Sequence, residues 1–288
     1  MSAAVIRVGV AGWTYAPWRG VFYPGDLKRE QELAHAARHF RTIEIGETFH
    51  GIQRPESFET WARQVPADFA FTVLAPRDIT HVRRLRDIRI PLANFLASGL
   101  LRLGLHLGPI LWRLPANLRF DPVLIGSFLK MLPRDTAHAA AIGRDHDRTL
   151  RGRPYLDTDI VRPIRHAVEV RHGSFRCQDF IDLLRAHGVA LACTAGAGEP
   201  APMDVTSNFI YCRLRGPEGI GLDGYDTAAL DLWSRRIKSW AGGEEPADAA
   251  RIGGKARASK RDVFVVFDND RKVRAPANAL ELIRRLRP

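Results

Sequence analysis

The segment HAVEVRHGSF (residues 166–175) brings a carboxylate, a guanidinium and an imidazole together in one short run. In a β-strand, side chains two residues apart project from the same face, so Glu169 and Arg171 would share one face and the valines beside them the other. His172 follows directly, and an imidazole gains or loses a proton near neutral pH. These residue types suit a site in which an arginine binds a phosphate or carboxylate group while Glu169 or His172 transfers a proton.

Two other strand-like runs, TIEIG (42–46) and FIYCRLRG (209–216), also carry charge on one face. Their apolar residues alternate with polar ones, which predicts that the apolar side faces helices and the polar side faces the interior of a sheet or barrel. The polar side receives Glu44 from the first run, and Tyr211, Arg213 and Arg215 from the second. A last run, DVFVVFDND, ends in Asp268, Asn269 and Asp270.

Two interpretations of these charges stay open. A lone buried charge is costly, so we expect Glu44 and Glu169 to pair with Arg171, Arg213 or Arg215, and such pairs alone would make a purely structural network. Alternatively, the excess of arginine forms a pocket for an anion. The candidate catalytic residues are then Glu169, His172, Glu44 and Asp268, and the candidate binding residues are Trp13, Arg171, Arg213, Arg215, Asn269 and Asp270.

The elements that must position these residues alternate along the chain. Eight β-branched runs predict strands at residues 5–12, 42–46, 69–76, 108–114, 166–171, 189–196, 208–216 and 262–270. Helical patterns follow most of them, but only a short proline-rich link separates the sixth and seventh strands. Because no glycine-rich nucleotide motif follows a strand, we favour a single (β/α)8 TIM-like barrel, with an irregular or missing sixth crossover helix, over a doubly wound sheet.

The length of 288 residues suits one such α/β domain spanning residues 1–288, with excursions expected at 134–159 and 242–261. Barrel enzymes build their active sites at the carboxyl ends of the strands. Asp268, Asn269 and Asp270 would lie at the carboxyl end of the last strand. We therefore expect the candidate residues to gather at that end of the barrel.

Net charge, apolar runs and cysteine pattern indicate which classes of partner and which compartment to expect. The net charge of +11 favours an anionic small molecule or nucleic acid, although scattered arginines on helices are also typical of a solvated face. No apolar run approaches the roughly 20 residues of a membrane span. The three cysteines show no pairing or metal-binding pattern, so we expect a cytoplasmic protein without membrane association; the pattern does not indicate an oligomeric state.

Aromatic and histidine residues give weaker indications. Trp13 directly follows the first predicted strand, where an exposed ring could stack on a base or a sugar. His50, His81 and His106 lie in or after strand-like runs, but their spacing matches no metal motif. We therefore expect no cofactor and no obligatory metal.

Several runs, in the same order along nearly the whole chain, resemble the YecE-like family, the domain of unknown function 72. They include VGVAGWTYAPWRGVFYP, TIEIGETFH, LGPILWRLPANLRFDP, HAVEVRHGSF, FIYCRLRG and DVFVVFDND. The resemblance implies a TIM-like barrel and no established reaction. The residues that match the family pattern are Trp13, Glu44, Glu169, Arg171, His172, Arg213, Asn269 and Asp270.

The chain also departs from that family pattern. Gly46 and His50 replace the usual asparagine and tyrosine, and Leu74 and Thr194 stand where a lysine and an aspartate are common. Arg215 and Asp268 replace the usual histidine and asparagine. The resemblance thus leaves open whether this member keeps any chemistry of the family.

Three functional hypotheses follow. In the first, the barrel binds a phosphorylated or nucleotide-like ligand at its carboxyl mouth and acts on it as a hydrolase. In the second, the protein is a non-catalytic nucleic-acid-binding protein whose basic surface neutralises phosphates. In the third, the interior charges only stabilise the barrel.

Overall fold

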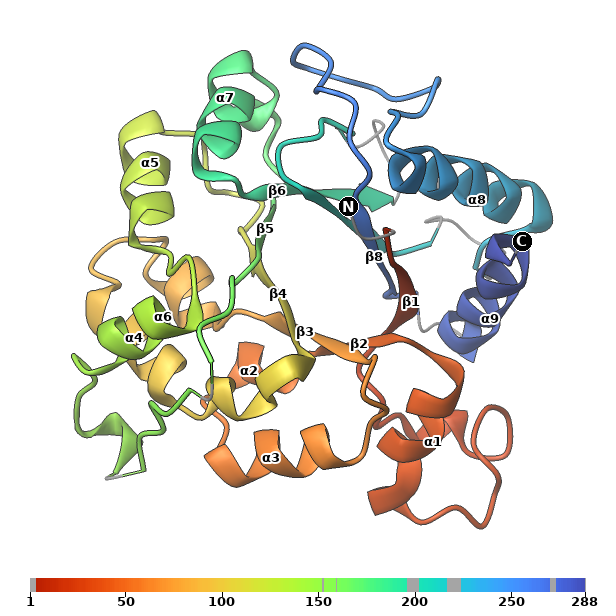
Figure 1. Cartoon of the computed structure of the whole chain (residues 1–288), viewed down its shortest axis with the longest axis horizontal. Helices are drawn as coiled ribbons and strands as arrows, with labels where there is room; N and C mark the ends of the chain where they lie inside the picture. Colours follow the sequence, from red (N-terminus) through yellow and green to blue (C-terminus); the bar gives the residue numbers. More distant parts are fainter. Residues whose placement is uncertain are drawn as a thin grey trace. The chain divides into compact units, whose positions relative to one another are not determined.

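The computed structural model of the chain describes residues 4–151, 153–158, 160–195, 202–216, 224–269 and 273–287 (Figure 1). Within these ranges, eight strands follow one another in chain order and close into a barrel of parallel strands. The strands are β1 (Ile6–Ala11), β2 (Thr42–Ile45), β3 (Ala70–Leu74), β4 (Leu107–Arg113), β5 (His166–Glu169), β6 (Ala190–Ala195), β7 (Phe209–Leu214) and β8 (Asp262–Phe267). The predicted TIM-like barrel is confirmed.

Helices lie between most strands. They are α1 (Glu32–His39), α2 (Glu47–His50), α3 (Pro55–Arg63), α4 (Arg89–Ala97), α5 (Pro122–Met131), α6 (Thr136–Gly143), α7 (Gln178–His187), α8 (Thr227–Gly242) and α9 (Arg274–Leu286). Within residues 202–208, the described part of the β6–β7 connection, there is no helix, as the short proline-rich link predicted. No helix in the described ranges has both the length and the apolar character that a bilayer span requires.

Local sequence explains where the helices begin. The Asp121 side chain accepts hydrogen bonds from the N–H groups of Val123 and Leu124, and Pro122 occupies the first position of α5. Asp226 caps α8 in the same way, by accepting from the N–H of Ala229. Such caps satisfy backbone donors that a helix leaves without partners at its start.

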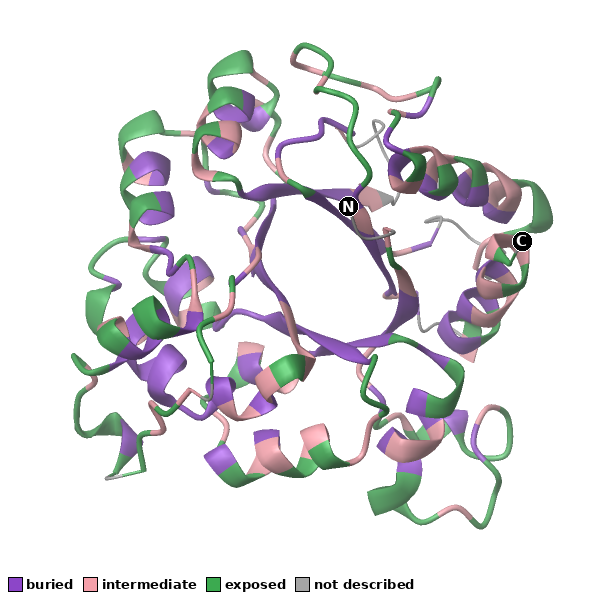
Figure 2. Cartoon of the chain, in the orientation of Figure 1, coloured by how far each residue is buried: buried purple, intermediate pink, exposed green. Residues whose placement is uncertain are grey.

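The strands are buried almost throughout, whereas each long helix shows both buried and exposed residues (Figure 2). This pattern is typical of parallel strands covered on both faces. It also means that any charged side chain on the inner face of a strand is removed from water. The charges predicted for β2, β5 and β7 therefore need partners.

The contacts divide the chain into two compact units, one of Met1–Glu44 with Leu184–Pro288 and the other of Ile45–Leu183. We describe their side-chain clusters separately, and a single domain over 1–288 stays a prediction. The expected excursion at 134–159 contains α6, which the alanine-rich run AHAAA favours. The expected excursion at 242–261 is anchored, because the Asp204 carboxylate accepts from the N–H groups of Ile252 and Gly253 at 2.9 and 2.7 Å.

Candidate functional site

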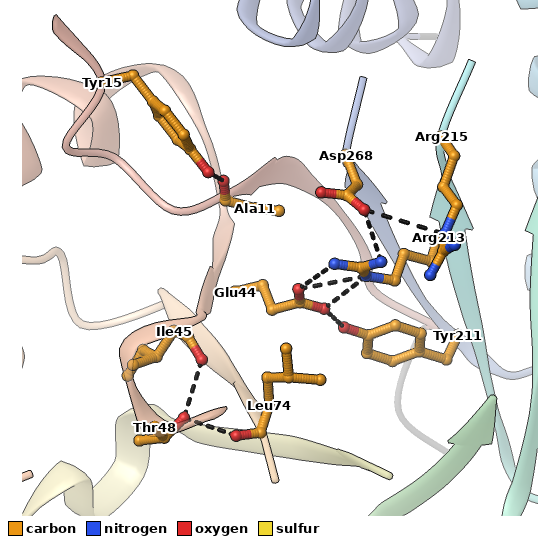
Figure 3. A network of polar contacts seen from close by, with 10 residues as sticks. All are labelled: Ala11, Tyr15, Glu44, Ile45, Thr48, Leu74, Tyr211, Arg213, Arg215 and Asp268. Carbon is orange, nitrogen blue, oxygen red and sulfur yellow. Dashed lines mark hydrogen bonds and ion pairs between the residues drawn. The ribbon is translucent and has the colours of Figure 1, made fainter. Parts of the chain in front are cut away.

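A buried ion-pair cluster joins three strands of the first unit (Figure 3). The Arg213 guanidinium on β7 donates to the Glu44 carboxylate on β2, with Nη2 to Oε1 at 2.9 Å and Nε to both oxygens at 3.2 Å. The Tyr211 hydroxyl donates to Glu44 Oε2 at 2.8 Å. Asp268, directly after β8, lies 2.6 Å from Arg213 Nη1 through its Oδ2. The expected pairing of Glu44 with an arginine of β7 is confirmed.

The strand register produces this cluster. Arg213 pairs with Val266 across β7 and β8, and the N–H of Asp268 donates to the Leu214 carbonyl, so the carboxylate of Asp268 stands at the carboxyl end beside Arg213. Glu44 and Arg213 are only 1% and 2% exposed. A pair this deep in the protein holds its geometry, because breaking it would leave an uncompensated buried charge.

The charges of this cluster balance. Two carboxylates, Glu44 and Asp268, face the Arg213 guanidinium and the more distant Arg215, whose Nε lies 3.9 Å from Asp268 Oδ2. Binding of an external anion by Arg213 and Arg215 stays a prediction, but Arg213 already contacts two carboxylates. This arrangement favours a structural or positioning role for the first-unit cluster.

The other predicted residues of the first unit are placed less favourably for ligand contact. Trp13 is only 7% exposed, and its carbonyl accepts from the Tyr23 hydroxyl at 2.7 Å, so its ring is not the exposed stacking surface that the sequence suggested. Asn269 is also 7% exposed and donates through Nδ2 to Asn278 Oδ1 at 2.9 Å. Asp270 lies outside the described residues.

The second unit carries its own polar cluster at the ends of β4 and β5. The register places Arg113, the last residue of β4, beside Glu169, the last residue of β5, and the N–H of Leu114 donates to the Glu169 carbonyl at 2.9 Å. Glu169 is 1% exposed. The Arg113 guanidinium carbon lies 5.1 Å from the centre of the Phe49 ring, a cation–π distance. Sequence reasoning did not single out Arg113 as a neighbour of Glu169.

Three arginines of the second unit lie near His81. Its ring lies 5.1 Å from that of Phe49, edge to face, and its Nδ1 is 2.9 Å from the Thr80 hydroxyl. Burial lowers the pKa of His81, and the positive charges of Arg113, Arg77 and Arg171 lower the pKa further, in that order. Burial and nearby positive charges both disfavour the protonated imidazole.

His172 has a defined tautomer. The N–H of Ser174 donates to His172 Nδ1 at 3.1 Å, and the Ser174 hydroxyl lies 2.8 Å from the same nitrogen. Because Nδ1 accepts from a backbone N–H, it carries no proton, so the Ser174 hydroxyl must be the donor in that contact; the same hydroxyl oxygen accepts from the N–H of Phe120 at 2.8 Å. The neutral ring must carry its proton on Nε2, which makes His172 a hydrogen-bond donor to a ligand rather than a ready general base.

The structure thus places the predicted residues in two groups. Glu44, Arg213, Arg215 and Asp268 belong to the first unit, and Glu169, Arg171 and His172 to the second, where Arg77, Arg113 and His81 join them. Within the described ranges, no group of three His, Cys, Asp or Glu side chains is arranged to hold a metal ion. The absence of a metal requirement stays a prediction.

Solved structures with a similar fold and one protein-family model match this chain. A DUF72 family protein from Thermotoga maritima has a solved structure that matches with a TM-score of 0.70 and 22% identity, over 98% of this chain and 99% of that one. A DUF72 family protein from Enterococcus faecalis matches with a TM-score of 0.67 and 16% identity, over 98% and 95%. A search of curated proteins finds no match. The model of the family described as "Protein of unknown function DUF72" matches residues 7–288, and the chain therefore belongs to the DUF72 family.

Proposed function

We propose that the protein binds an anionic ligand, phosphorylated or nucleotide-like, at the carboxyl ends of β3, β4 and β5. The observation that supports this proposal is the gathering of Arg77, Arg113 and Arg171 near His81. Guanidinium groups match the geometry of phosphate and carboxylate oxygens and bind them through paired hydrogen bonds.

The topology brings these arginines to one end of three neighbouring strands. Arg77 follows β3, Arg113 ends β4, and Arg171 follows β5 by two residues. The N–H of Ala75 donates to the Leu111 carbonyl, and β4 pairs with β5 up to Arg113 and Glu169, so the three carboxyl ends are adjacent. In barrel enzymes this end of the strands is where ligands bind.

Arg77 and Arg171 differ from the arginines of the first-unit cluster in their hydrogen-bonding partners. Both are exposed, and neither side chain forms a hydrogen bond or an ion pair with another residue of the described ranges. Arg213, in contrast, pairs with Glu44 and Asp268. Arg77 and Arg171 therefore have donors to offer to an incoming anion.

Hydrolysis of the bound ligand is the reaction class that we propose. Glu169 is the candidate acid or base, because its buried carboxylate stands beside Arg113 at the end of β5. His172 would donate a hydrogen bond through Nε2 to a ligand oxygen. Activity is to be assayed only with a ligand that first proves to bind, with Glu169→Gln as the variant that keeps the shape and removes the carboxylate.

The decisive experiment measures binding of inorganic phosphate and pyrophosphate by isothermal titration calorimetry at constant ionic strength. Wild type should bind at least one of them saturably, and Arg171→Gln should weaken binding about tenfold, as expected for loss of one charge-assisted pair. Arg235→Gln removes the same charge from an exposed position of α8 and should leave the affinity unchanged. Equal affinities for both variants and wild type would refute an anion site at these strand ends.

A further inference from the structure

A hollow of about 540 Å³ lies in the second unit, next to the carboxyl end of β3. Its volume falls within the range of sites for small organic molecules, roughly 300–1,000 Å³. Pro76, Ile79 and Asn94 are buried residues of its lining, whereas Ile52 and Ile90 are 41% and 39% exposed. The hollow therefore combines a buried lining with exposed apolar side chains, a combination that suits the apolar stem of a ligand.

The backbone that shapes one wall is unusual. Asp78–Val82 forms a π-helical turn, and Arg84, Leu85 and Asp87 follow with positive φ angles of 50°, 65° and 50°. Leu85 is 4% exposed and its N–H donates to the Ile79 carbonyl at 3.0 Å, which fixes the loop against the protein. The wall that carries Asp87 is thus held by a buried anchor.

The charge of the lining contrasts with that of the chain. Three aspartates, Asp78, Asp87 and Asp147, line the hollow with one arginine, Arg83, in a protein whose net charge is +11. Arg83 Nε pairs with Asp78 Oδ2 at 3.0 Å. The Asp87 carboxylate forms no hydrogen bond or ion pair with any residue that the structure describes. One carboxylate is therefore available to a cation.

The second available carboxylate is held in place. Asn94 donates to Asp147 Oδ1 at 3.0 Å and accepts from the Asp147 N–H at 3.0 Å. Hydrogen bonds from Thr149 and Asn94 lower the pKa of Asp147, so that this group stays ionised in mild acid. A fixed carboxylate loses little entropy when it pairs with a ligand.

We propose that this hollow binds a small organic cation, an ammonium or guanidinium group on an apolar stem. The stem packs on Ile52, Ile79 and Ile90, and the charged group lies between Asp87 and Asp147. The carboxylates do not converge as metal ligands would, because no described group of three such side chains is arranged to hold a metal ion. Separated carboxylates beside apolar surface suit an extended organic cation better.

The test compares three probes that share one stem and differ in charge: hexylamine, hexanol and hexanoate. Binding to the full chain is measured by calorimetry near neutral pH and at constant ionic strength. Hexylammonium should bind saturably and about tenfold more tightly than hexanol, and hexanoate should bind most weakly, because only the cation gains from the carboxylates. Equal affinity for the three probes, or no saturable binding of hexylamine, would overturn the proposal.

Variants locate the site. Asp87→Asn should weaken hexylammonium binding about fivefold or more, and asparagine tolerates the positive φ of this position, so the loop should keep its conformation. Asp179→Asn removes a similar exposed carboxylate from the first turn of α7 and should change nothing. Unchanged affinity in Asp87→Asn would refute the assignment. Phosphate binding at the arginine group should be the same in both variants, which separates this proposal from the proposed function.

Discussion

Single residues show how the layer between strands and helices accommodates polar groups. His166 is buried on β5, accepts a hydrogen bond at Nδ1 from the Trp112 indole at 3.1 Å, and lies 2.7 Å through Nε2 from the Pro133 carbonyl. Both nitrogens are thus satisfied by the neutral ring. Burial lowers the pKa of His166 from 6.5 to about 4. The contact with the Pro133 carbonyl raises the pKa, but by less than burial lowers it.

This lowered pKa predicts a pH dependence of stability. Between about pH 6.5 and pH 4 the unfolded chain binds a proton at His166 that the folded chain does not, so the free energy of unfolding falls as the pH falls. Over that window the contribution amounts to about 3 kcal/mol. Urea unfolding of wild type and His166→Gln across this range should show a flatter dependence in the variant. His138→Gln, on the exposed face of α6, should follow wild type, and parallel curves for all three proteins would contradict the prediction.

Two departures from the family pattern turn out to be neighbours. Arg215 and Asp268, which stand where histidine and asparagine are usual, form an ion pair at 3.9 Å, and Asp268 also contacts Arg213. The added positive and negative charges therefore offset one another at the carboxyl ends of β7 and β8. Leu74, another departure, is 4% exposed, and its carbonyl accepts from the Thr48 hydroxyl at 2.6 Å (Figure 3).

At the scale of elements, the pair of Glu44 and Arg213 links β2 to β7. Arg213→Met should lower the free energy of unfolding by about 3–5 kcal/mol, because it leaves the buried Glu44 carboxylate without its arginine. Glu44→Gln should lower it less, because Arg213 keeps its contact with Asp268. The double variant should lose clearly less than the sum of the two losses, because it removes both charges together. Chemical denaturation of wild type, the two single variants and the double variant measures this coupling. Additive losses would mean that the interaction between Glu44 and Arg213 contributes little to the free energy of unfolding.

Strand alternation also explains which parts of the site were predictable. In TIEIG and FIYCRLRG, isoleucines and leucine flank the charged residues, so the inward placement of Glu44 and Arg213 could be read directly. The same alternation in GPILWRL places Arg113 on one face of the strand and Ile110 and Trp112 on the other. Because most residues of this run are apolar, its alternation is less clear than in the other two runs. Arg77 and His81 lie in a loop and a π-helical turn, which leave no periodic pattern, so only the folded chain places them beside Arg113.

Helix signals within the irregular stretches were weaker. The stretch 134–159 reads as a loop because charges and glycines surround its alanines, yet Asp135 caps α6 by accepting from the N–H of His138 at 2.8 Å. The cap and the alanines together favour a helix only eight residues long. Elements this short depend on tertiary contacts, which sequence patterns do not record.

At the scale of the whole molecule, the net charge of +11 must be separated from the proposed anion site. A diffuse positive field attracts any polyanion, and that attraction weakens steeply as the salt concentration rises, because the release of counterions into a more concentrated salt solution is less favourable. Several arginines already pair with carboxylates, such as Arg89 with Asp145 and Arg236 with Asp248, so these guanidinium groups are not concentrated into one basic surface for a nucleic acid. A general field and a specific pocket should therefore respond differently to salt and to mutation.

Fluorescence anisotropy with labelled single- and double-stranded oligonucleotides distinguishes the two. We expect binding at low salt that disappears near physiological salt and is equal in wild type and Arg171→Gln, since one exposed arginine changes a diffuse field little. Binding that persists at physiological salt and is weakened by Arg171→Gln but not by Arg235→Gln would instead make nucleic acid the ligand of the arginine group. Because the phosphate titration uses the same variants, the two measurements together decide whether the arginines at the ends of β3, β4 and β5 recognise a small anion or a polymer.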